Sequence, residues 1–473
     1  MGGNIFPTGL RRARLQVLFI LFLIHLDFVL LAQISHQGNN YLEYSIDTKN
    51  DERYFEDWLD FSLQYRNWRA GIRYEFHLPP QPFSLDTVGQ GIYQRFIEYS
   101  YKNFTSRLGN FYTMLGRGLV LRAFEERLLR WDTNADGIRL LYYSNKFDLE
   151  LLGGRMRDRT GVRRDIFQAS QFTYKPFSLM QAGGTFVVSK FNIPGDVYWG
   201  SVFSMLNFNF GDFYVEYAGK DFPESIPEGY AVYLAMNLFL GPLSLLTEYK
   251  DYEEYKIEEG VTYNNPPTAI REHLYTLLNR KQPEQNANNE KGYMMQAVYP
   301  IKENAFLTGS YSRTNNHNND LQYEDIYFQV ELDYPAYLEW VWAGGQQKDL
   351  VARYINFVNT TSFNISDFNS IKFQLEHQHA KTHATNRQYY DQLISLSFSR
   401  APDWTISALS ERSTDQTSEQ EFWLGFQLDA QIFPNYDLTI FAGSRRKGKL
   451  CLGGNCVNRP AFEGLEFRLV NRF

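Results

Sequence analysis

Apolar and polar residues alternate along most of this chain, and two segments show the pattern most clearly. In residues 322–333 the apolar positions are Ile326, Phe328, Val330 and Leu332, and the intervening ones are Tyr327, Gln329, Glu331 and Asp333. Residues 420–432 repeat the alternation. A period of two sustained over about ten residues predicts β-strands whose two faces meet different surroundings. A soluble β-sandwich would show the same alternation, so it is the repetition along the chain that favours a barrel.

The strands are predicted to form hairpins joined by very short turns. We place these turns near Asn67, Asn103, Asn145, Pro176, Gly211, Gly241, Lys302, Pro335, Ser366, Pro402 and Pro434. With a first strand at 40–47 and a closing strand at the C-terminus, the hairpins give about 24 antiparallel strands, within a range of about 20 to 26. A single-chain transmembrane barrel requires an even number. We therefore predict an all-β fold, a transmembrane antiparallel β-barrel.

Both ends of the chain resemble export or assembly signals. The last strand alternates apolar and polar residues and ends on an aromatic residue, Phe473, which is the usual assembly signal of a Gram-negative outer-membrane barrel. At the other end, arginines at positions 11, 12 and 14 precede an apolar run that leads to Ala32. This pattern is typical of a secretory signal peptide, so we predict a signal peptide at 1–32 and a single barrel domain at 33–473. An uncleaved membrane anchor is the alternative.

The composition narrows the class of protein further. Aromatic residues make up 17% of the sequence, with 33 Tyr and 38 Phe, as expected where rings collect at two membrane interfaces. After the N-terminal run, no stretch reaches about 18 apolar residues, which argues against a helical membrane protein. The net charge of -7 gives no reason to expect nucleic acid as a partner. The expected partners are outer-membrane lipid, the barrel assembly machinery and a small solute.

Long connections alternate with the short turns. They span 78–90, 114–135, 254–290, 312–320, 379–388 and 445–460, and the third contains a possible short helix at 268–280. Barrels of about 22 or more strands are normally plugged. Only a few residues separate the predicted cleavage site from the first strand. We therefore expect outer loops that fold inward to fill the lumen, unless a partner occupies it.

Segment 109–140 holds the strongest candidates for a functional loop. Its candidate residues for a pore constriction are Arg117, Arg122, Glu125, Glu126, Arg127 and Arg130. Gly116 and Gly118 permit a tight turn where the chain leaves the barrel wall. Fixed arginines would form a constriction that selects among solutes by binding anionic groups. The alternative is a lattice of salt bridges that only pins the loop to the wall, and the two interpretations are compatible.

Two segments also resemble an uncharacterised family of Gram-negative outer-membrane barrels, known mainly as a domain of unknown function. The resemblance rests on GNFY, GRGL, LRAFEER and DTNADG within 109–140, and on a C-x4-C loop with a Pro and a Gly before the last strand, within 445–469. It implies the barrel fold and an outer-membrane location. It brings no established catalytic or binding residue.

Two smaller groups of residues are further candidates. Cys451 and Cys456 are the only cysteines, and in an exported protein two thiols so close in sequence are predicted to form a loop disulfide. A metal site would need two more ligands, and neither a metal nor a cofactor is predicted. Arg73, Glu75 and His77 share the lumenal face of one strand. A His beside a carboxylate fits a general base, and an ion-pair network is the alternative.

Three functions remain open from the sequence. The leading hypothesis is a porin-like channel for small solutes, constricted by its inward loops. The second is a surface-binding or assembly and secretion barrel that holds a protein or glycan partner. The third is an outer-membrane hydrolase, for which no serine, second acid or oxyanion geometry can be assigned. The chain is therefore not predicted to be an enzyme.

Overall fold

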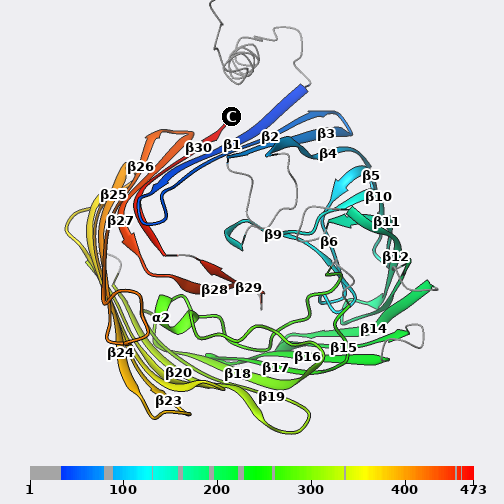
Figure 1. Ribbon diagram of the computed structural model, residues 1–473. Coiled ribbons are helices and arrows are strands. Elements are labelled where there is room, and N and C mark those ends of the chain that lie inside the picture. The colour runs from blue at the N-terminus through cyan, green and yellow to red at the C-terminus, as the bar shows by residue number, and fades with distance from the viewer. Residues whose placement is uncertain are drawn as a thin grey trace, which may run out of the picture.

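A computed structural model describes residues 34–78, 89–129, 131–157, 163–190, 196–221, 228–257, 262–334, 337–452, 455–459 and 461–473. Its main element is one closed antiparallel sheet of 24 strands (Figure 1). The strands are β1 (Ile34–Asp47), β2 (Glu52–Tyr65), β3 (Trp68–Leu78), β4 (Gln90–Tyr101), β5 (Phe104–Phe111), β10 (Ala135–Tyr143), β11 (Phe147–Arg157), β12 (Arg163–Phe177), β13 (Met180–Lys190), β14 (Asp196–Phe208), β15 (Gly211–Asp221), β16 (Gly229–Leu240), β17 (Leu243–Glu253), β18 (Asn289–Lys302), β19 (Ala305–Asn315), β20 (Leu321–Tyr334), β21 (Leu338–Asp349), β22 (Ala352–Asn364), β23 (Asn369–Thr382), β24 (Gln388–Arg400), β25 (Trp404–Ser413), β26 (Phe422–Phe433), β27 (Tyr436–Arg445) and β30 (Phe462–Arg472). The predicted fold class and strand number are confirmed.

The barrel closes where its first strand pairs with its last. Strands β1 and β30 lie side by side in antiparallel register (Figure 1). The backbone N–H of Phe473 donates to the carbonyl oxygen of Gly38 at 3.0 Å, and the Phe473 ring stacks on Phe61 with 6.4 Å between ring centroids. The terminal aromatic residue therefore covers the seam.

The hairpins follow the predicted order. The predicted turn near Pro335 lies outside the described residues. The other predicted short turns lie between or beside strand ends, among them those near Asn67, Asn103 and Asn145. The predicted first strand, 40–47, is too short, because strand β1 already begins at Ile34, where it pairs with Tyr65. These turns lie at the same end of the barrel as the start of β1 and the end of β30, and we call it the turn end. The longer connections lie at the opposite end, the loop end.

The outer face of the barrel is apolar. In β26, for example, Phe422, Leu424 and Phe426 are exposed, whereas Trp423 between them is buried on the inner face. An apolar outer surface on a closed barrel is stable when lipid covers it, so the fold is that of a transmembrane β-barrel. Among the described residues, no helix has the length and apolar character needed to cross a membrane.

Within the part of the chain that the structure describes, three connections at the loop end fold into the lumen, where Figure 1 shows β6, β9, α2, β28 and β29 inside the ring of strands. Lumenal loop 1 (residues 112–134) carries β6 (Thr113–Leu115), β7 (Leu121–Ala123), β8 (Glu125–Glu126), the 3-10 turn η1 (Arg127–Leu129) and β9 (Trp131–Asp132). Lumenal loop 2 (residues 254–288) carries α2 (Thr276–Asn279). Lumenal loop 3 (residues 446–461) carries the hairpin of β28 (Gly448–Leu452) and β29 (Asn455–Arg459).

The helix predicted at 268–280 is wrong in extent. Only Thr276–Asn279 are helical. Arg271 and His273, which precede this turn, reach separate wall strands through Gln296 and Asp325. An extended backbone that spreads its side chains over neighbouring strands cannot also form helical hydrogen bonds, and tertiary contacts override the local propensity.

Candidate functional site

Lumenal loop 1 is pinned to the barrel wall by a cluster of ion pairs. Arg73 of β3 donates to Asp60 of β2 at 2.6 Å and also to Glu125 of the loop. Arg127 of the loop lies 3.2 Å from Asp60 and 3.5 Å from Glu125. Arg73 is only 5% exposed, so its charge would be costly without these partners. Two separate groups of predicted site residues thus meet in one cluster, which holds the loop in place.

His77 and Glu75 extend this cluster along β3. The Nε2 atom of His77 lies 3.2 Å from a Glu75 oxygen, and its Nδ1 atom lies 3.4 Å from Glu56 of β2. Glu75 is also 3.8 Å from Arg73, and all these side chains are buried. Within the described part of the chain, no group of three or more His, Cys, Asp or Glu side chains is placed to hold a metal ion. His77 and the carboxylates of Glu56 and Glu75 thus form one buried contact network with Arg73.

On its other side, lumenal loop 1 touches the wall through a glycine. Gly116 has φ +60°, and a Cβ atom there would lie 1.9 Å from a carboxylate oxygen of Glu216 in β15. That carboxylate accepts hydrogen bonds from the backbone N–H of Arg117 at 2.8 Å, from Ser201 at 2.6 Å and from Tyr214 at 2.7 Å. The predicted tight turn is confirmed. Its glycine is needed for close contact with the wall as well as for the backbone conformation.

An apolar core joins lumenal loop 1 to the wall and to lumenal loop 2. Its members from loop 1 are Leu115, Leu119, Val120, Leu121 and Ala123. Those from the wall include Val187, Trp199 and Tyr252, and those from loop 2 are Tyr255, Ile257, Tyr263 and Ala287. The Trp199 indole donates to the carbonyl oxygen of Val120 at 2.8 Å. Each fully buried leucine contributes roughly 2 kcal/mol. On this side of the lumen the loop is therefore a packed body.

The remaining charged residues of lumenal loop 1 differ in exposure. Arg117 is exposed, with its guanidinium 4.8 Å from the centre of the Tyr214 ring. Arg122 is half-buried; burial lowers the pKa of its guanidinium, and the carboxylates of Glu126 and Glu272 act in the opposite direction. Arg127 is also exposed. Arg130 lies outside the described residues.

Lumenal loop 2 is pinned along the inside of β18 to β25 by contacts that the sequence analysis did not identify. His273 lies 2.8 Å from Asp325, and both side chains are fully buried. Two backbone N–H groups at the start of α2 donate to Glu376 at 3.2 and 2.8 Å. The Arg280 guanidinium donates to both oxygens of Glu411, one of them at 2.9 Å. The only signal in the sequence was that each acid occupies a lumenal position of an alternating strand.

Lumenal loop 3 is held in a similar way. Arg446 lies 2.9 Å from Asp391 and 3.1 Å from Glu411. The backbone of its hairpin places Cys451 directly opposite Cys456. The side chains of both cysteines lie outside the described part of the structure, so the disulfide remains a prediction.

Mass spectrometry without reduction tests the disulfide. We expect Cys451 and Cys456 to be oxidised to each other in freshly isolated membranes. Replacing both by Ser should leave the barrel folded, because so small a ring is local and contributes about 2 kcal/mol by the chain-entropy estimate. Two freely alkylated thiols would contradict the prediction.

Between the loops and the short turns, the lumenal wall carries a belt of polar side chains, and lumenal loop 1 reaches its edge, where Arg139 donates to the carbonyl oxygen of Tyr112 at 3.1 Å. One row runs across β3, β4, β5 and β10 as Arg69, Glu98, Arg107 and Arg139. Arg107 lies 3.4 Å from Glu98, and Arg139 lies 2.8 Å from Glu150 of β11. Hydroxyl pairs such as Ser397 with Ser407, at 2.8 Å, line the wall at β24 and β25. We call this region the turn half of the lumen, and the region that the loops occupy the loop half.

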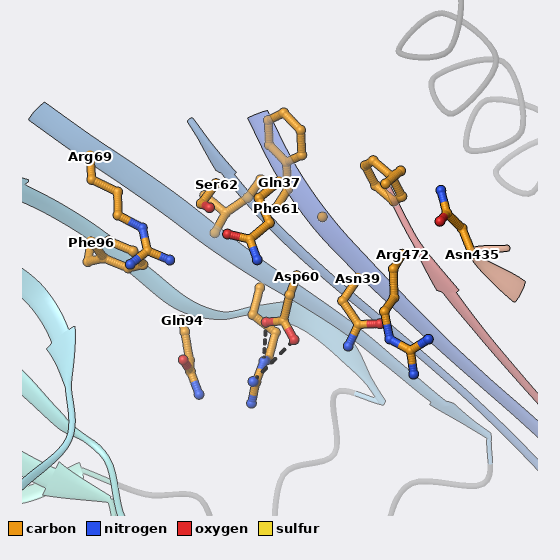
Figure 2. Close-up of a pocket in the computed structure, with 14 residues that line it drawn as sticks. Gln37, Asn39, Asp60, Phe61, Ser62, Arg69, Gln94, Phe96, Asn435 and Arg472 are labelled. Atoms are coloured by element: carbon orange, nitrogen blue, oxygen red, sulfur yellow. Dashed lines mark hydrogen bonds and ion pairs between the residues drawn. The ribbon is translucent and has the colours of Figure 1, made fainter. Parts of the chain in front are cut away.

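A cavity lies in the turn half, beside this row. On the lumenal side its lining includes Gln37, Asn39, Asp60, Arg69, Gln94 and Arg472. Figure 2 shows Asp60, Arg69 and Gln94 on the same side of the strands, whereas Phe61 points away from them. Arg73 was predicted as a site residue from the sequence and Arg69 was not, although both occupy the same face of β3, four positions apart.

Across the barrel, the turn half carries carboxylates. Glu331 and Asp333 belong to β20, and Glu339 of β21 is the direct cross-strand neighbour of Asp333. None of the three forms an ion pair with a described residue. Lys372 lies two strands further along the same row. Figure 1 places β20 across the ring from β3 and β4, so unpaired carboxylates face the arginine row.

The family of unknown function DUF6029 matches residues 29–335, and the chain belongs to that family. No curated protein matches the sequence.

Three solved structures illustrate the similarity in fold. The P pilus usher (PapC) translocation pore has 9% identity, with 93% of this chain and 99% of that chain covered and a TM-score of 0.47. The copper transporter OprC has 9% identity, coverage of 93% and 80%, and a TM-score of 0.48. The siderophore receptor PirA from Pseudomonas aeruginosa has 10% identity, coverage of 93% and 80%, and a TM-score of 0.44. Similarities this distant carry no argument about function.

Proposed function

We propose that this protein is an outer-membrane channel through which small polar solutes diffuse. One observation carries the proposal: lumenal loop 1 is fixed to the wall on two sides, at Arg73 and at Glu216, whereas the turn half beyond it is lined by exposed polar side chains. A fixed loop sets the width of a passage, and a polar lining keeps water in it. Salt-bridge pinning and constriction are then two aspects of the same structure.

Conductance of the purified protein in planar lipid bilayers tests this function. A channel should give discrete conductance steps without any partner. The control is the same preparation after heat denaturation, with folding of the active sample checked by heat-modifiable gel mobility. Folded protein that inserts but never conducts would contradict the channel and leave the alternative in which a protein or glycan partner fills the barrel.

The proposed location includes an orientation. We place the turn end in the periplasm and the loop end outside the cell, as is usual for outer-membrane barrels, with residues 1–32 acting as the export signal and Phe473 as the signal for the barrel assembly machinery. Asn318, in the β19–β20 connection, and Asn435, in the β26–β27 turn, are both exposed. Intact cells should label Asn318→Cys with an impermeant maleimide and leave Asn435→Cys unlabelled until lysis. The reverse pattern would overturn the orientation.

A further inference from the structure

Arg69 differs from the other arginines of its wall. Arg73, four positions along the same face of β3, is held by Asp60 and Glu125, and Arg107 faces Glu98. Arg69 is exposed to the lumen and forms no ion pair with a described residue. Its guanidinium therefore retains donors that the protein itself does not use.

The Arg69 guanidinium nevertheless has a defined position. It lies 5.6 Å from the centre of the Phe96 ring, and the Arg107 guanidinium lies 3.6 Å from the same ring. Figure 2 shows Arg69 reaching toward Phe96. The ring lies across Gly71, where a Cβ atom would come within 2.5 Å of it. A glycine, a phenyl ring and two guanidinium groups thus form one stacked unit, and stacking of this kind restricts a long side chain without consuming its hydrogen-bond donors.

The charge around Arg69 favours an anion. Arg69, Arg107 and Arg139 lie in one row, in which only Arg107 and Arg139 have carboxylate partners, Glu98 and Glu150. The acid that lines the cavity, Asp60, is already paired with Arg73 and Arg127. Glu98, directly opposite Arg69 in the register, is already the ion-pair partner of Arg107. A solute anion beside Arg69 would therefore meet a cation without an ion-pair partner of its own among the described residues, and no free carboxylate in the cavity lining.

The cavity also lies beside lumenal loop 1. Gln94, which lines it, donates to the Tyr112 hydroxyl of lumenal loop 1 at 2.5 Å. Asn39 lines the same cavity and offers a second side-chain amide. A solute that passes the loop would thus meet amide groups and Arg69 at the entrance to the turn half.

We propose that this cavity is a binding subsite for small carboxylate solutes, with Arg69 as the residue that recognises the carboxylate group. A guanidinium binds a carboxylate through two parallel hydrogen bonds, a geometry that an ammonium group cannot reproduce. The inference rests on the proposed channel function, because it names the class of solute that the channel prefers. Binding and conduction are nevertheless separate measurements.

Titration calorimetry of the purified full-length protein in detergent tests the subsite with succinate as probe and succinamide as its neutral counterpart. We expect succinate to bind and succinamide not to bind. Arg69→Gln should weaken succinate binding by about tenfold or more, the effect of losing one charged hydrogen-bonding partner. Arg69→Lys keeps the positive charge but cannot form the two parallel hydrogen bonds. Its affinity for succinate should lie between that of Arg69→Gln and that of the wild type.

Arg353→Gln is the matched control, because it removes one exposed arginine from the outer face of β22. Its affinity for succinate should equal that of the wild type. Equal affinity of the wild type for succinate and succinamide, or unchanged succinate affinity in Arg69→Gln, would overturn the subsite. Neither outcome depends on conductance: a barrel that conducts without binding succinate refutes only the subsite, and one that never conducts refutes the channel.

Discussion

The loop half and the turn half of the lumen use charge in opposite ways. In the loop half, the charged groups that hold the loops to the wall are largely buried and paired, as in the contacts of Arg73 with Glu125 and of Arg280 with Glu411. In the turn half, Arg69 and Glu339 are exposed and have no ionic partner among the described residues. Paired buried charges fix positions, whereas unpaired exposed charges remain available to solutes. The paired residues therefore fix the structure of the passage, and the unpaired residues would determine its selectivity for solutes.

Removal of lumenal loop 1 should produce the largest effect. Replacing residues 114–131 by a short Gly-Ser linker should raise single-channel conductance several-fold, because the loop and its packed core leave the lumen. The control is the same replacement of residues 316–320, which join the adjacent strands β19 and β20 and contact the ends of β17 and β18 through His317. Unchanged conductance in the first variant, with folding confirmed by gel mobility, would mean that the loop does not limit the passage.

Two arginines of β3 allow the comparison to be tested within one strand. Arg73→Ala leaves Asp60 and Glu125 without their main partner and should lower the free energy of unfolding by about 3 kcal/mol, toward the low end for a broken buried pair because Asp60 is partly exposed. Arg69→Ala should change it by about 0.5 kcal/mol or less. Urea unfolding in lipid vesicles measures both. Similar losses in the two variants would show that the division between the halves is wrong.

Replacing the loop arginines should have a smaller effect than removing the whole of lumenal loop 1. Replacing Arg117, Arg122 and Arg127 together by Ala removes three positive charges from the loop. We expect a modestly higher conductance and a weaker preference for chloride over potassium, since both the side-chain volume and the positive field shrink. Reversal potentials in a potassium chloride gradient report this preference. If they match those of Arg353→Ala, the arginines serve only to pin the loop.

The smallest expected effect concerns a charge cluster at the rim. Glu419, in the β25–β26 connection, accepts hydrogen bonds from Lys447 at 2.7 Å and from Lys49 at 2.9 Å, and these lower the pKa of its carboxyl group to about 2. A folded-state pKa below the ordinary value means that the contacts stabilise the loops at neutral pH and are lost only as the pH falls through about 2.

Carbon NMR of the Glu side-chain carboxyls in nanodiscs, with the signal assigned through Glu419→Gln, tests this expectation. The midpoint should lie near 2 and should rise in Lys447→Gln. A midpoint near the ordinary value of 4.5 in the unchanged protein would show that the cluster does not form.

The strands of the barrel wall could be predicted because the sequence pattern that specifies each strand lies within that strand. Each strand must show lipid and lumen to alternate residues, so the pattern of 322–333 predicts strand β20 within a residue at each end. Short turns break that pattern at regular intervals, which is why the strand count was correct. Strand β1 was predicted too short because its first residues, among them His36 and Gln37, do not alternate in polarity, and pairing with β2 holds them in the sheet.

The interior could be predicted only in part. Loop 1 was identified by its charges, but its wall contacts join distant positions, such as the Arg117 backbone and Glu216, 99 residues apart. His273 and Asp325 are 52 residues apart, and nothing in either segment indicates the other. Sequence alternation says that a side chain faces the lumen without saying which loop it meets. Arg69 was missed for the same reason, since only the structure shows that it lacks a partner while Arg73 has several.

The exposure of Arg69 has a consequence for a cell whose surroundings vary in salinity. Ions in the lumen screen an exposed charge over a Debye length of about 8 Å at 0.15 M salt and about 3 Å at 1 M, whereas buried ion pairs such as Arg73 with Glu125 are screened much less. Brackish or concentrated medium should therefore weaken the attraction of the arginine row for carboxylates while the aperture set by the loops keeps its size. Discrimination by charge would fade in salt, and discrimination by size would persist.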